Sequence, residues 1–469
     1  MLLKGQWVSG QGTFEVRDPQ NGAVLATVPA GTARDVEAAV AGAGRGREIA
    51  RAVPAHERKA ILHRAAEILR AQGEEIARLL ARDSSKTIRE ARREVVRAVN
   101  TMQLSAEEAT RLHGETIPFD QRPGAEGRIG FYERFPVGIV GAITPFNDPL
   151  NLVVHKVAPA VAAGNAVVLK PASLAPLCAY VVVDALIEAG LPPEVVSLVT
   201  GDGRVLGEAL ASHPDVPLIS FTGGLATGER ITRIAGVKKL VMELGANSPA
   251  IVLRDADLER AVAATVSGGY GNAGQNCLGV QRILLDAPVY KEFCARFLEQ
   301  VAALRMGDKA DELTDMGPMI SESAAQRVES WVHEAISLGA RLLAGGRRTG
   351  AFYEPTVLEG VPRGCTLDRE EVYGPVVSLY RVEGLDEAIA LANDTPYGLQ
   401  AGIFTHDIDL ALRCARELDM GGVMINDSSD FRVDAMPFGG VKGSGLGREG
   451  VRYAAEEMTE IRVVCVRLA

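Results

Sequence analysis

The sequence predicts an α/β fold with two domains, each built around a mostly parallel sheet. Short apolar segments of strand type alternate with helical segments from residue 137 onward, in two successive series. This alternation is typical of βαβ units with right-handed crossovers. A chain of 469 residues is also too long for one hydrophobic core. Its 50 glycines and 5% aromatic residues favour the close turns of α/β proteins.

The expected elements follow one another in a regular order. Residues 32–112 are rich in Ala, Glu and Arg with apolar spacings of three and four, which predicts helices. The first series places strands at 137–144, 166–170, 195–200, 218–222 and 239–244, with helices at 176–189, 205–212 and 227–235. The second places strands at 249–253, 281–285, 376–381, 400–404 and 422–426, with helices beginning at Leu258 and Val289. Segments 128–134 and 460–468 have strand character outside both series, so we expect them to pair across subunits.

Composition and charge exclude several classes of protein. A net charge of -10 argues against nucleic acid or an acidic membrane as a partner. The six cysteines (178, 277, 294, 365, 414 and 465) show neither zinc-site nor disulfide spacing, so we expect no metal and a reducing compartment. The first residues lack a signal-peptide pattern, and apolar runs such as 161–169 are too short to cross a bilayer. These features predict a soluble cytoplasmic protein without a membrane partner.

One cysteine in a loop of small residues is the most informative candidate site. The segment 271–277 reads Gly-Asn-Ala-Gly-Gln-Asn-Cys, and its glycines allow a sharp turn that leaves the Cys277 sulfur open to a ligand. A free thiol with a pKa of about 8.5 is only a few per cent thiolate at neutral pH, yet it is already strongly nucleophilic. Taken alone, the loop fits a nucleophile and a small buried turn cysteine equally well.

Three strand ends carry turns suited to ligand binding. Asn147 follows the strand 137–144, where its amide can donate to a developing oxyanion or stabilise its own turn. Lys170 ends the strand 166–170, where it can reach a ribose or phosphate or extend its ammonium to solvent. The turn 221–228 is rich in glycine, and its amides can face a pyrophosphate although it lacks the Gly-x-Gly-x-x-Gly pattern.

The order of these motifs resembles that of the aldehyde dehydrogenase superfamily. Asn147, Lys170, the 221–228 turn, Glu243, Cys277, the segment 370–375 (Glu-Glu-Val-Tyr-Gly-Pro) and the segment 437–440 (Pro-Phe-Gly-Gly) recur in that order and spacing. The resemblance runs from about residue 10 to the end. It implies two Rossmann-type domains plus a small β element for oligomerisation. Residues 1–121 and 142–243 would form the dinucleotide-binding domain, 244–436 the catalytic domain, and 122–141 and 455–469 the oligomerisation strands of a homodimer or homotetramer.

The resemblance also implies a role for each motif. Cys277 would be the nucleophile that attacks an aldehyde, Asn147 and the Cys277 amide the oxyanion hole, and Glu243 the general base that releases the acid. Lys170 and Glu371 would hold the two riboses of NAD or NADP, and Lys170 is counted with the catalytic residues as well. The whole implied cofactor site comprises Thr144, Pro145, Phe146, Lys170, Ser173, Gly203, Phe221, Thr222, Gly223, Gly224, Glu243, Leu244, Gly245, Glu371 and Tyr373. For Glu243 the alternative is a structural carboxylate at a strand end.

Three departures from the family pattern affect these expectations. Ser173 stands where strictly NAD-dependent members often carry Glu. A carboxylate there would repel a 2′-phosphate, so we predict that both NAD and NADP are used. Gly224 and Leu225 replace the usual Ser or Thr, so pyrophosphate contacts should rely more on backbone. Gly245-Ala246 replaces the usual Gly-Gly, which should cost little if the local φ is negative.

Substrate expectations rest on three basic residues. Segments 146–155 and 428–434 resemble the branch with lactaldehyde, glyceraldehyde-3-phosphate and phosphonoacetaldehyde dehydrogenases. At the positions of that family's substrate funnel the chain has Arg97, His155 and Arg432, which suit a short aldehyde with an anionic tail. The expected substrate site also includes Asn147, Asn276 and Phe438. A purely structural interpretation puts Arg97 on a solvated helix face, pairs Arg432 with Asp430 or Asp434, and makes His155 a core residue.

Three other functions fit part of the sequence. A coenzyme A-acylating semialdehyde dehydrogenase passes the thioester to a thiol, but such relatives typically lack the equivalent of Glu243. A non-catalytic scaffold of the same fold has no need of Cys277, Glu243 and Asn147 together. A cysteine hydrolase needs a His partner, and the seven histidines lie in no pairing motif. We therefore expect NAD(P)-dependent oxidation of an aldehyde to its acid.

Overall fold

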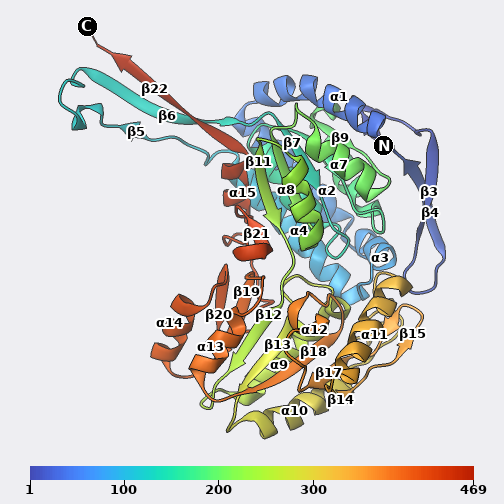
Figure 1. The fold of residues 1–469 in the computed structure, drawn as a ribbon. Coiled ribbons are helices and arrows are strands. Elements are labelled where there is room, and N and C mark those ends of the chain that lie inside the picture. Colours follow the sequence, from blue (N-terminus) through green and yellow to red (C-terminus); the bar gives the residue numbers. More distant parts are fainter. Residues whose placement is uncertain (469) are drawn as a thin grey trace.

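Two large sheets dominate the computed structural model, which describes residues 1–468 (Figure 1). The first sheet has the order β2-β1-β9-β8-β7-β10-β11-β21, and its five central strands are parallel. These are β7 (Ile139–Ile143), β8 (Ala166–Lys170), β9 (Val196–Leu198), β10 (Leu218–Thr222) and β11 (Lys239–Glu243). The edges are antiparallel, and they consist of β1 (Leu2–Leu3), β2 (Gln6–Trp7) and β21 (Gly445–Leu446).

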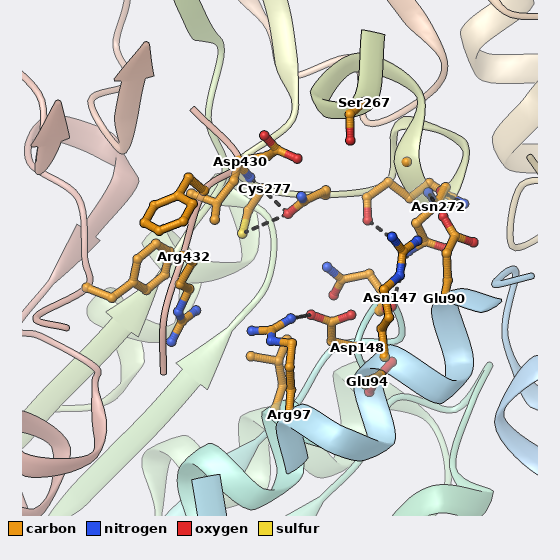
Figure 2. A pocket seen from close by; sticks show the side chains of 18 of the residues that line it. Glu90, Glu94, Arg97, Asn147, Asp148, Ser267, Asn272, Cys277, Asp430 and Arg432 are labelled. Atoms are coloured by element: carbon orange, nitrogen blue, oxygen red, sulfur yellow. Dashed lines mark hydrogen bonds and ion pairs between the residues drawn. The ribbon is translucent and has the colours of Figure 1, made fainter. Parts of the chain in front are cut away.

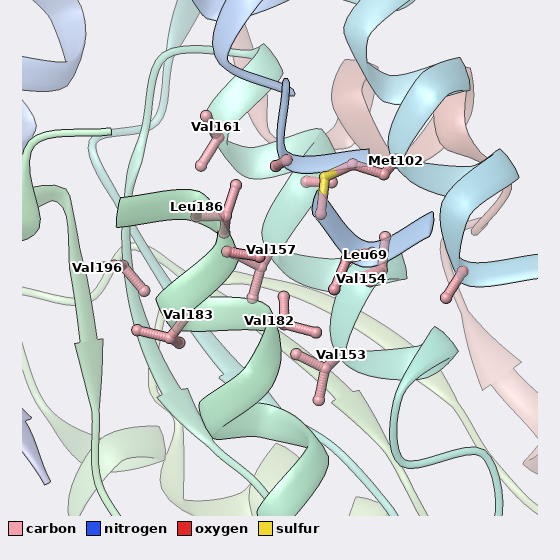
Figure 3. Close-up of a cluster of buried hydrophobic side chains, with 14 of the residues drawn as sticks. Leu69, Met102, Val153, Val154, Val157, Val161, Val182, Val183, Leu186 and Val196 are labelled. Atoms are coloured by element: carbon pink, nitrogen blue, oxygen red, sulfur yellow. The ribbon is translucent and has the colours of Figure 1, made fainter. Parts of the chain in front are cut away.

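Helices cover both faces of the first sheet because every central strand is apolar on both sides. Ile139 and Val168 pack on one face against α1 (Ala33–Ala52), α7 (Gly203–Ser212) and α8 (Leu225–Ile234). Val140 follows Ile139 and Val167 precedes Val168 in the sequence, and both pack on the opposite face because side chains alternate along a strand. That face is covered by α2 (Ala55–Ala71), α3 (Gly73–Asp83), α4 (Ile88–Glu108), α5 (Asn151–Ala162) and α6 (Leu177–Glu188). Figure 3 shows the valines of α5 and α6 meeting in this core.

The second sheet has the order β14-β17-β18-β13-β12-β19-β20. Its strands are β12 (Ser248–Val252), β13 (Val280–Asp286), β14 (Arg341–Ala344), β17 (Thr356–Glu359), β18 (Val376–Val382), β19 (Gln400–Phe404) and β20 (Gly422–Ile425), with β14 antiparallel to its neighbour. Its helices are α9 (Leu258–Tyr270), α10 (Tyr290–Ala303), α11 (Glu322–Ser337), α12 (Thr366–Arg369), α13 (Leu385–Asn393) and α14 (Ile408–Glu417). The chain therefore passes from the first sheet to the second between Glu243 and Ser248, where the sequence analysis placed a domain boundary.

A three-stranded sheet projects from the body of the molecule (Figure 1). In it β22 (Thr459–Arg467) pairs along its whole length with β6 (Arg128–Pro136), which also pairs with β5 (Thr116–Ile117). The helix α15 (Val451–Glu457) leads into β22. Two expectations need correction. Residues 116–117, expected in the dinucleotide-binding domain, form β5 of the projecting sheet. Residues 139–141 belong to β7 of the first sheet and not to the projecting strands. Gly138, at a φ of 111°, lies between β6 and β7.

Two small hairpins complete the fold. β3 (Gly12–Arg17) pairs with β4 (Val24–Ala30), and β15 (Arg348–Thr349) pairs with β16 (Phe352–Tyr353). The sequence analysis did not predict either hairpin. In the part of the chain that the structure describes, every helix is too short or too polar to cross a membrane.

The strand register brings the polar strand ends of the first sheet to one edge. Lys170 pairs with Ile143, and Glu243 pairs with Thr222, in neighbouring parallel strands. Thr144 follows Ile143 directly, so it lies at the same edge. Ligands of open parallel sheets bind at the carboxyl ends of the strands. This edge is therefore where a ligand of the first sheet is expected.

Candidate active site

A cavity of about 640 Å³ lies where the carboxyl edge of the first sheet meets the second sheet (Figure 2). It is lined by α4, by α9, by the turn after β7, by the last residues of β10 and β11, by the loop before β13, and by the segment 427–438. The structure brings together in its wall most of the residues that the sequence analysis named for catalysis and substrate binding. They are Arg97, Asn147, Glu243, Asn276, Cys277, Arg432 and Phe438, and Thr222 of the expected cofactor site lies in the same wall.

The loop that carries Cys277 is strained and tightly anchored. Asn272 and Ala273 have φ values of 52° and 53°, in the left-handed region that costs non-glycine residues about 1–3 kcal/mol each. The Asn272 amide N–H donates to Glu90 Oε1 of α4 at 2.7 Å. Its side-chain Nδ2 donates to the Asn147 carbonyl oxygen at 3.2 Å. These bonds hold the cysteine loop against the turn after β7, and they offset the backbone strain.

The Cys277 sulfur lies in the cavity as a thiol. Burial raises the pKa of Cys277 to about 12, and the nearby Glu371, Glu243 and Asp148 carboxylates act in the same direction. The Arg432 guanidinium opposes them, because its positive charge favours a thiolate. The closest polar partner of Sγ is Asn276 Oδ1 at 3.9 Å. The nucleophilic form therefore needs a base in the same cavity.

Glu243 is a carboxylate of that kind. Its side chain is 2% exposed, and neither carboxylate oxygen has a hydrogen-bond partner among residues 1–468. Burial raises the pKa of Glu243 well above its usual range, and repulsion by the Glu449 carboxylate raises it further. A Cβ on Gly439 would lie 2.9 Å from Glu243 Oε1, so glycine is needed beside it. An unpaired buried acid of this kind is costly for folding and is a mark of functional sites.

Asn147 and the Cys277 backbone amide both present hydrogen-bonding groups to the cavity. Asn147 is 5% exposed, and within the described chain its Oδ1 has no donor. The Cys277 N–H likewise has no acceptor among residues 1–468. The alternative that Asn147 serves to stabilise its own turn is not supported by any bond from its side chain to that turn in the described residues.

Arg432 is a buried cation in the wall of the cavity. Its side chain is 7% exposed, and the guanidinium carbon lies 3.7 Å above the centre of the Phe438 ring. Its Nη2 lies 3.5 Å from Glu449 Oε2, and its Nε has no hydrogen-bond partner in the described chain. Glu449 is bound more closely by Lys156 of α5, at 2.7 Å, and this pairing lowers the pKa of Glu449 to about 2. Arg432 thus keeps donor capacity for a ligand.

The other two basic residues of the expected anion site are engaged within the protein. Arg97 forms ion pairs with Asp434 at 2.9 Å and with Asp148 at 3.3 Å. His155 is fully buried outside the cavity lining, and its Nε2 lies 2.9 Å from Asp434 Oδ1. Burial lowers the pKa of His155. His155 therefore fits the interpretation as a core residue, and the partner of Arg432 is Glu449 rather than Asp430 or Asp434.

The edge of the first sheet has the features of a dinucleotide site. The Thr144 and Thr222 hydroxyls are buried without partners in the described chain. Lys170 Nζ has no ion pair with residues 1–468, and burial lowers the pKa of Lys170 to about 8. A Cβ on Gly203 would lie 3.3 Å from Lys170 Nζ, so the glycine leaves room around the ammonium. These unsatisfied groups fit a ligand with ribose hydroxyls and phosphates, as NAD or NADP has.

The turns around this edge are shaped by close contacts. The Gly223 amide donates to the Glu243 carbonyl oxygen at 3.0 Å, and a Cβ there would overlap the Phe221 ring. Gly224 precedes α8 with open space beside it, as a backbone contact to a pyrophosphate requires. Ser173 lies past Lys170, and its hydroxyl donates to the Gly201 carbonyl oxygen. Leu244 packs closely on Gly228 of α8.

A second wall of the cofactor region comes from the segment after α12. Glu371 Oε1 accepts a hydrogen bond from the Ala246 amide at 2.9 Å, and burial raises the pKa of Glu371 to about 7. A Cβ on Gly245 would overlap the Glu371 carboxylate, so only glycine allows this approach. Tyr373 packs edge-on against Phe146, with ring centres 5.9 Å apart. Pro145 lies between Thr144 and Phe146 in the turn after β7.

Comparisons with known proteins show which family the chain belongs to. The model of the aldehyde dehydrogenase family matches residues 7–464. The chain is 51% identical over 455 residues to aspartate-semialdehyde dehydrogenase 1 of Pseudomonas canavaninivorans, with 97% of each protein covered. It is 45% identical over 468 residues to 3-sulfolactaldehyde dehydrogenase of Priestia aryabhattai, with 100% of this chain and 98% of that protein covered. The crystal structure of glyceraldehyde-3-phosphate dehydrogenase GapN from Methanocaldococcus jannaschii, complexed with NADP, matches with a TM-score of 0.93 and 43% identity, over 97% of this chain and 99% of that one.

The chain therefore belongs to the aldehyde dehydrogenase family. Within that class it is an NAD(P)-dependent oxidoreductase that acts on aldehydes, as the motif order indicated. The expected α/β fold with two parallel-rich sheets is confirmed.

Several residues of the cavity were missed by sequence reasoning. Asp148, Glu90 and Arg93 line it, and Lys156 and Glu449 form the buried pair that touches Arg432. Lys156 offered one signal, because it is a lysine inside the mostly apolar helix α5. Glu449 offered none, since its partners lie far away in the sequence.

The raised pKa of the Cys277 thiol has a measurable consequence. Because the thiolate forms only towards pH 12, alkylation of Cys277 by iodoacetamide should keep accelerating up to pH 10, with no plateau near the value of about 8.5 of a free thiol. Peptide-resolved mass spectrometry measures the rate, with the exposed Cys465 as internal reference. A plateau below pH 9 would show that the resting thiol is activated and that the burial argument is wrong.

Proposed function

We propose that this protein oxidises a short aldehyde with an anionic tail to the carboxylic acid, through a covalent intermediate on Cys277. The observation that carries the proposal is the buried Arg432 guanidinium with a free Nε in the same cavity as Cys277, Asn147 and Glu243. The first three groups supply anion recognition, a nucleophile and an oxyanion donor, and Glu243 supplies a base.

The first half of the mechanism forms a bond between sulfur and carbon. The Cys277 thiol passes its proton to a base in the cavity, and Sγ attacks the carbonyl carbon while the π electrons move to oxygen. Asn147 Nδ2 and the Cys277 N–H donate to that oxyanion. Removing one such donor costs about 3–4 kcal/mol of transition-state stabilisation in a hydrolase site. When bound, NAD(P)+ supplies the acceptor for the hydride that leaves the thiohemiacetal.

The second half releases the acid from the thioester. Glu243 takes a proton from water, whose oxygen attacks the thioester carbon, and the C–S bond then breaks with the electron pair returning to sulfur. The raised pKa of Glu243 makes it a stronger base than an exposed carboxylate, and it is neutral at low pH. The presence of this carboxylate in the cavity supports hydrolysis rather than transfer to coenzyme A. The buried Glu243 carboxylate without hydrogen-bond partners in the described chain, which is costly for folding, also argues against a non-catalytic scaffold.

Replacing Glu243 should separate the two half-reactions. In Glu243→Gln the steady-state rate should fall by about 10²–10⁴-fold because the general base is lost. About one equivalent of NAD(P)H should still form, more slowly than in the wild type because Glu243 also serves as the base for the Cys277 thiol, and mass spectrometry should find the acyl group on Cys277. Cys277→Ala is the matched control and should form no NAD(P)H. A Glu243→Gln enzyme with a normal steady-state rate, or a wild-type rate that requires coenzyme A, would contradict the proposal.

Relatives support an anionic substrate, since two are named for aldehydes with a carboxylate or a sulfonate. In Arg432→Met the side chain keeps its contact with Phe438 but loses its charge. A hydrogen bond to a charged group contributes about 1.5–3 kcal/mol, so kcat/KM for 4-oxobutanoate should fall about 10–100-fold further than kcat/KM for propanal. Steady-state kinetics with both aldehydes measure the ratio. Equal losses for both would show that Arg432 tunes Cys277 and does not bind the tail.

Both dinucleotides should serve as cofactor. The Ser173 hydroxyl is occupied by the Gly201 carbonyl, and a serine puts no like charge against a 2′-phosphate. The neighbouring GapN structure holds NADP. We expect kcat/KM values for NAD and NADP to lie within about 30-fold, or about 2 kcal/mol. Ser173→Glu should reduce the NADP value and spare the NAD value. A preference of wild-type enzyme above a thousandfold for either would overturn this expectation.

The projecting sheet supports an oligomer. The apolar side chains of Ile129, Ile461 and Val463 are 59%, 55% and 57% exposed on β6 and β22. Exposed apolar strands of this length usually find a partner strand or sheet. We propose that this sheet joins the subunits of a homodimer or homotetramer.

A further inference from the structure

A carboxylate from a neighbouring helix caps α5, which begins shortly after Asn147. The N-cap residue of α5 is Leu150, and it offers no side-chain acceptor to the first turn. Glu94 of α4 supplies one instead, because its Oε1 accepts the backbone N–H groups of Leu150 at 2.8 Å and of Asn151 at 2.9 Å. Free N–H groups at the start of a helix favour an anionic acceptor. The start of α5 is therefore held by α4 rather than by its own sequence.

The second oxygen of Glu94 connects this cap to Asp148. Lys86 Nζ lies 2.7 Å from Glu94 Oε2, and it also forms an ion pair with Asp148 Oδ1. Arg97 Nη1 binds the other oxygen of Asp148 at 3.3 Å. The Glu94 and Lys86 side chains are 1% and 8% exposed, so neither charge is solvated by bulk water. Each buried charge depends on the other, because removing one partner leaves its counter-ion buried and unpaired.

These contacts fix the backbone on both sides of the Asn147 side chain. The Asn147 carbonyl oxygen accepts from Asn272 Nδ2 at 3.2 Å, the next residue is held by Lys86, and Leu150 is held by Glu94. Figure 2 shows Glu94, Asp148 and Asn147 close together at the cavity. The Asn147 side chain makes no bond to its own turn, so its direction follows from the backbone that carries it. An oxyanion donor must lie about 2.7–3.1 Å from the developing charge, which leaves little tolerance for movement of this turn.

We propose that Glu94 is a positioning residue for the oxyanion step: by holding the amides of Leu150 and Asn151, it keeps Asn147 Nδ2 directed at the oxygen of the group that Cys277 attacks. This inference rests on the function proposed above, in which Cys277 is the nucleophile and Asn147 is an oxyanion donor. Lys86 is the counter-ion that Glu94 and Asp148 share. Glu94 acts through the turn and exchanges no proton with the reacting atoms.

Two reagents that modify the same sulfur test this role, and neither depends on which aldehyde is the substrate. With p-nitrophenyl acetate, Sγ attacks the ester carbon and the thiol proton goes to a base in the cavity. An oxyanion forms, and p-nitrophenolate then leaves as the thioester forms. Iodoacetamide alkylates Sγ by displacement of iodide, and no oxyanion forms in that step. Peptide-resolved mass spectrometry measures both rates at Cys277, with Cys277→Ala as the blank.

The expected results follow from this difference between the reagents. In Glu94→Ala the acylation rate should fall about 10–100-fold, approaching the loss of about 10²–10³-fold expected for Asn147→Ala. The alkylation rate should stay within about threefold of the wild type, because the thiol and its base are untouched. Glu107→Ala is the matched control, since it removes a partly exposed carboxylate from the same helix, and it should change neither rate.

A conservative variant covers the case in which Glu94→Ala does not fold. Glu94→Gln keeps an oxygen for the two amides but no charge for Lys86, so its acylation rate should fall only about threefold to tenfold. In either background, adding Asn147→Ala should give an acylation rate close to that of Asn147→Ala alone, because both residues act through one donor.

The outcomes separate this inference from the function on which it rests. Additive losses in the double variant, or equal falls in acylation and alkylation, would show that Glu94 only supports the fold, and its positioning role would be overturned. A wild-type acylation rate in Asn147→Ala would overturn both the oxyanion assignment and the role of Glu94. If acylation responds as expected but no short anionic aldehyde is oxidised with NAD or NADP, the role of Glu94 stands and the proposed function fails.

Discussion

The hydrogen bonds between the cysteine loop and the first sheet are the contacts on which the rest of the site depends. Asn272 donates to Glu90 on α4 and to the backbone of Asn147 after β7. These bonds keep two residues at positive φ in the loop that ends at Cys277. The nucleophile and the expected oxyanion donor come from different sheets, so their alignment depends on this junction. Backbone strain at an active site persists only where the surrounding structure holds it in this way.

Charge in the cavity is organised around one buried acid pair and one buried arginine. Glu243 and Glu449 repel each other, and Lys156 keeps Glu449 ionised, which leaves Glu243 as the group with the raised pKa. The Arg432 guanidinium lowers the pKa of Cys277, Glu243 and Glu449, because its positive charge favours the ionised form of each group. Two like acids in one cavity therefore acquire different protonation behaviour from their environments. That separation is a common way to create a general base at neutral pH.

The sequence analysis predicted the placement of the catalytic candidates in the cavity better than it predicted the surroundings of the substrate-site candidates. Cys277, Glu243 and Asn147 fall in motifs whose residues act through local turns and strand ends, so their positions follow from the parallel register. Arg97, Arg432 and His155 were grouped because of their charge. In the structure Arg97 and His155 share Asp434, and only the surroundings of Arg432 leave a donor available in the described chain. Pairing of long side chains depends on residues hundreds of positions apart, such as Arg97 with Asp434, which local pattern does not reveal.

The order of motifs resembled that of the family, and by itself the sequence also predicted the fold class, the central strands of the first sheet and the residues at its carboxyl edge. These features depend on apolar periodicity and on turn residues, which are local properties of a chain. The tertiary structure alone decided which charges are neutralised and which remain for a ligand. It paired Arg97 with Asp434 and Lys156 with Glu449, while Arg432 and Asp430 line the cavity. It also assigned residues 139–141 to the first sheet. The reason is that electrostatic pairing and burial depend on distance in space, and the sequence specifies that distance only after the chain has folded.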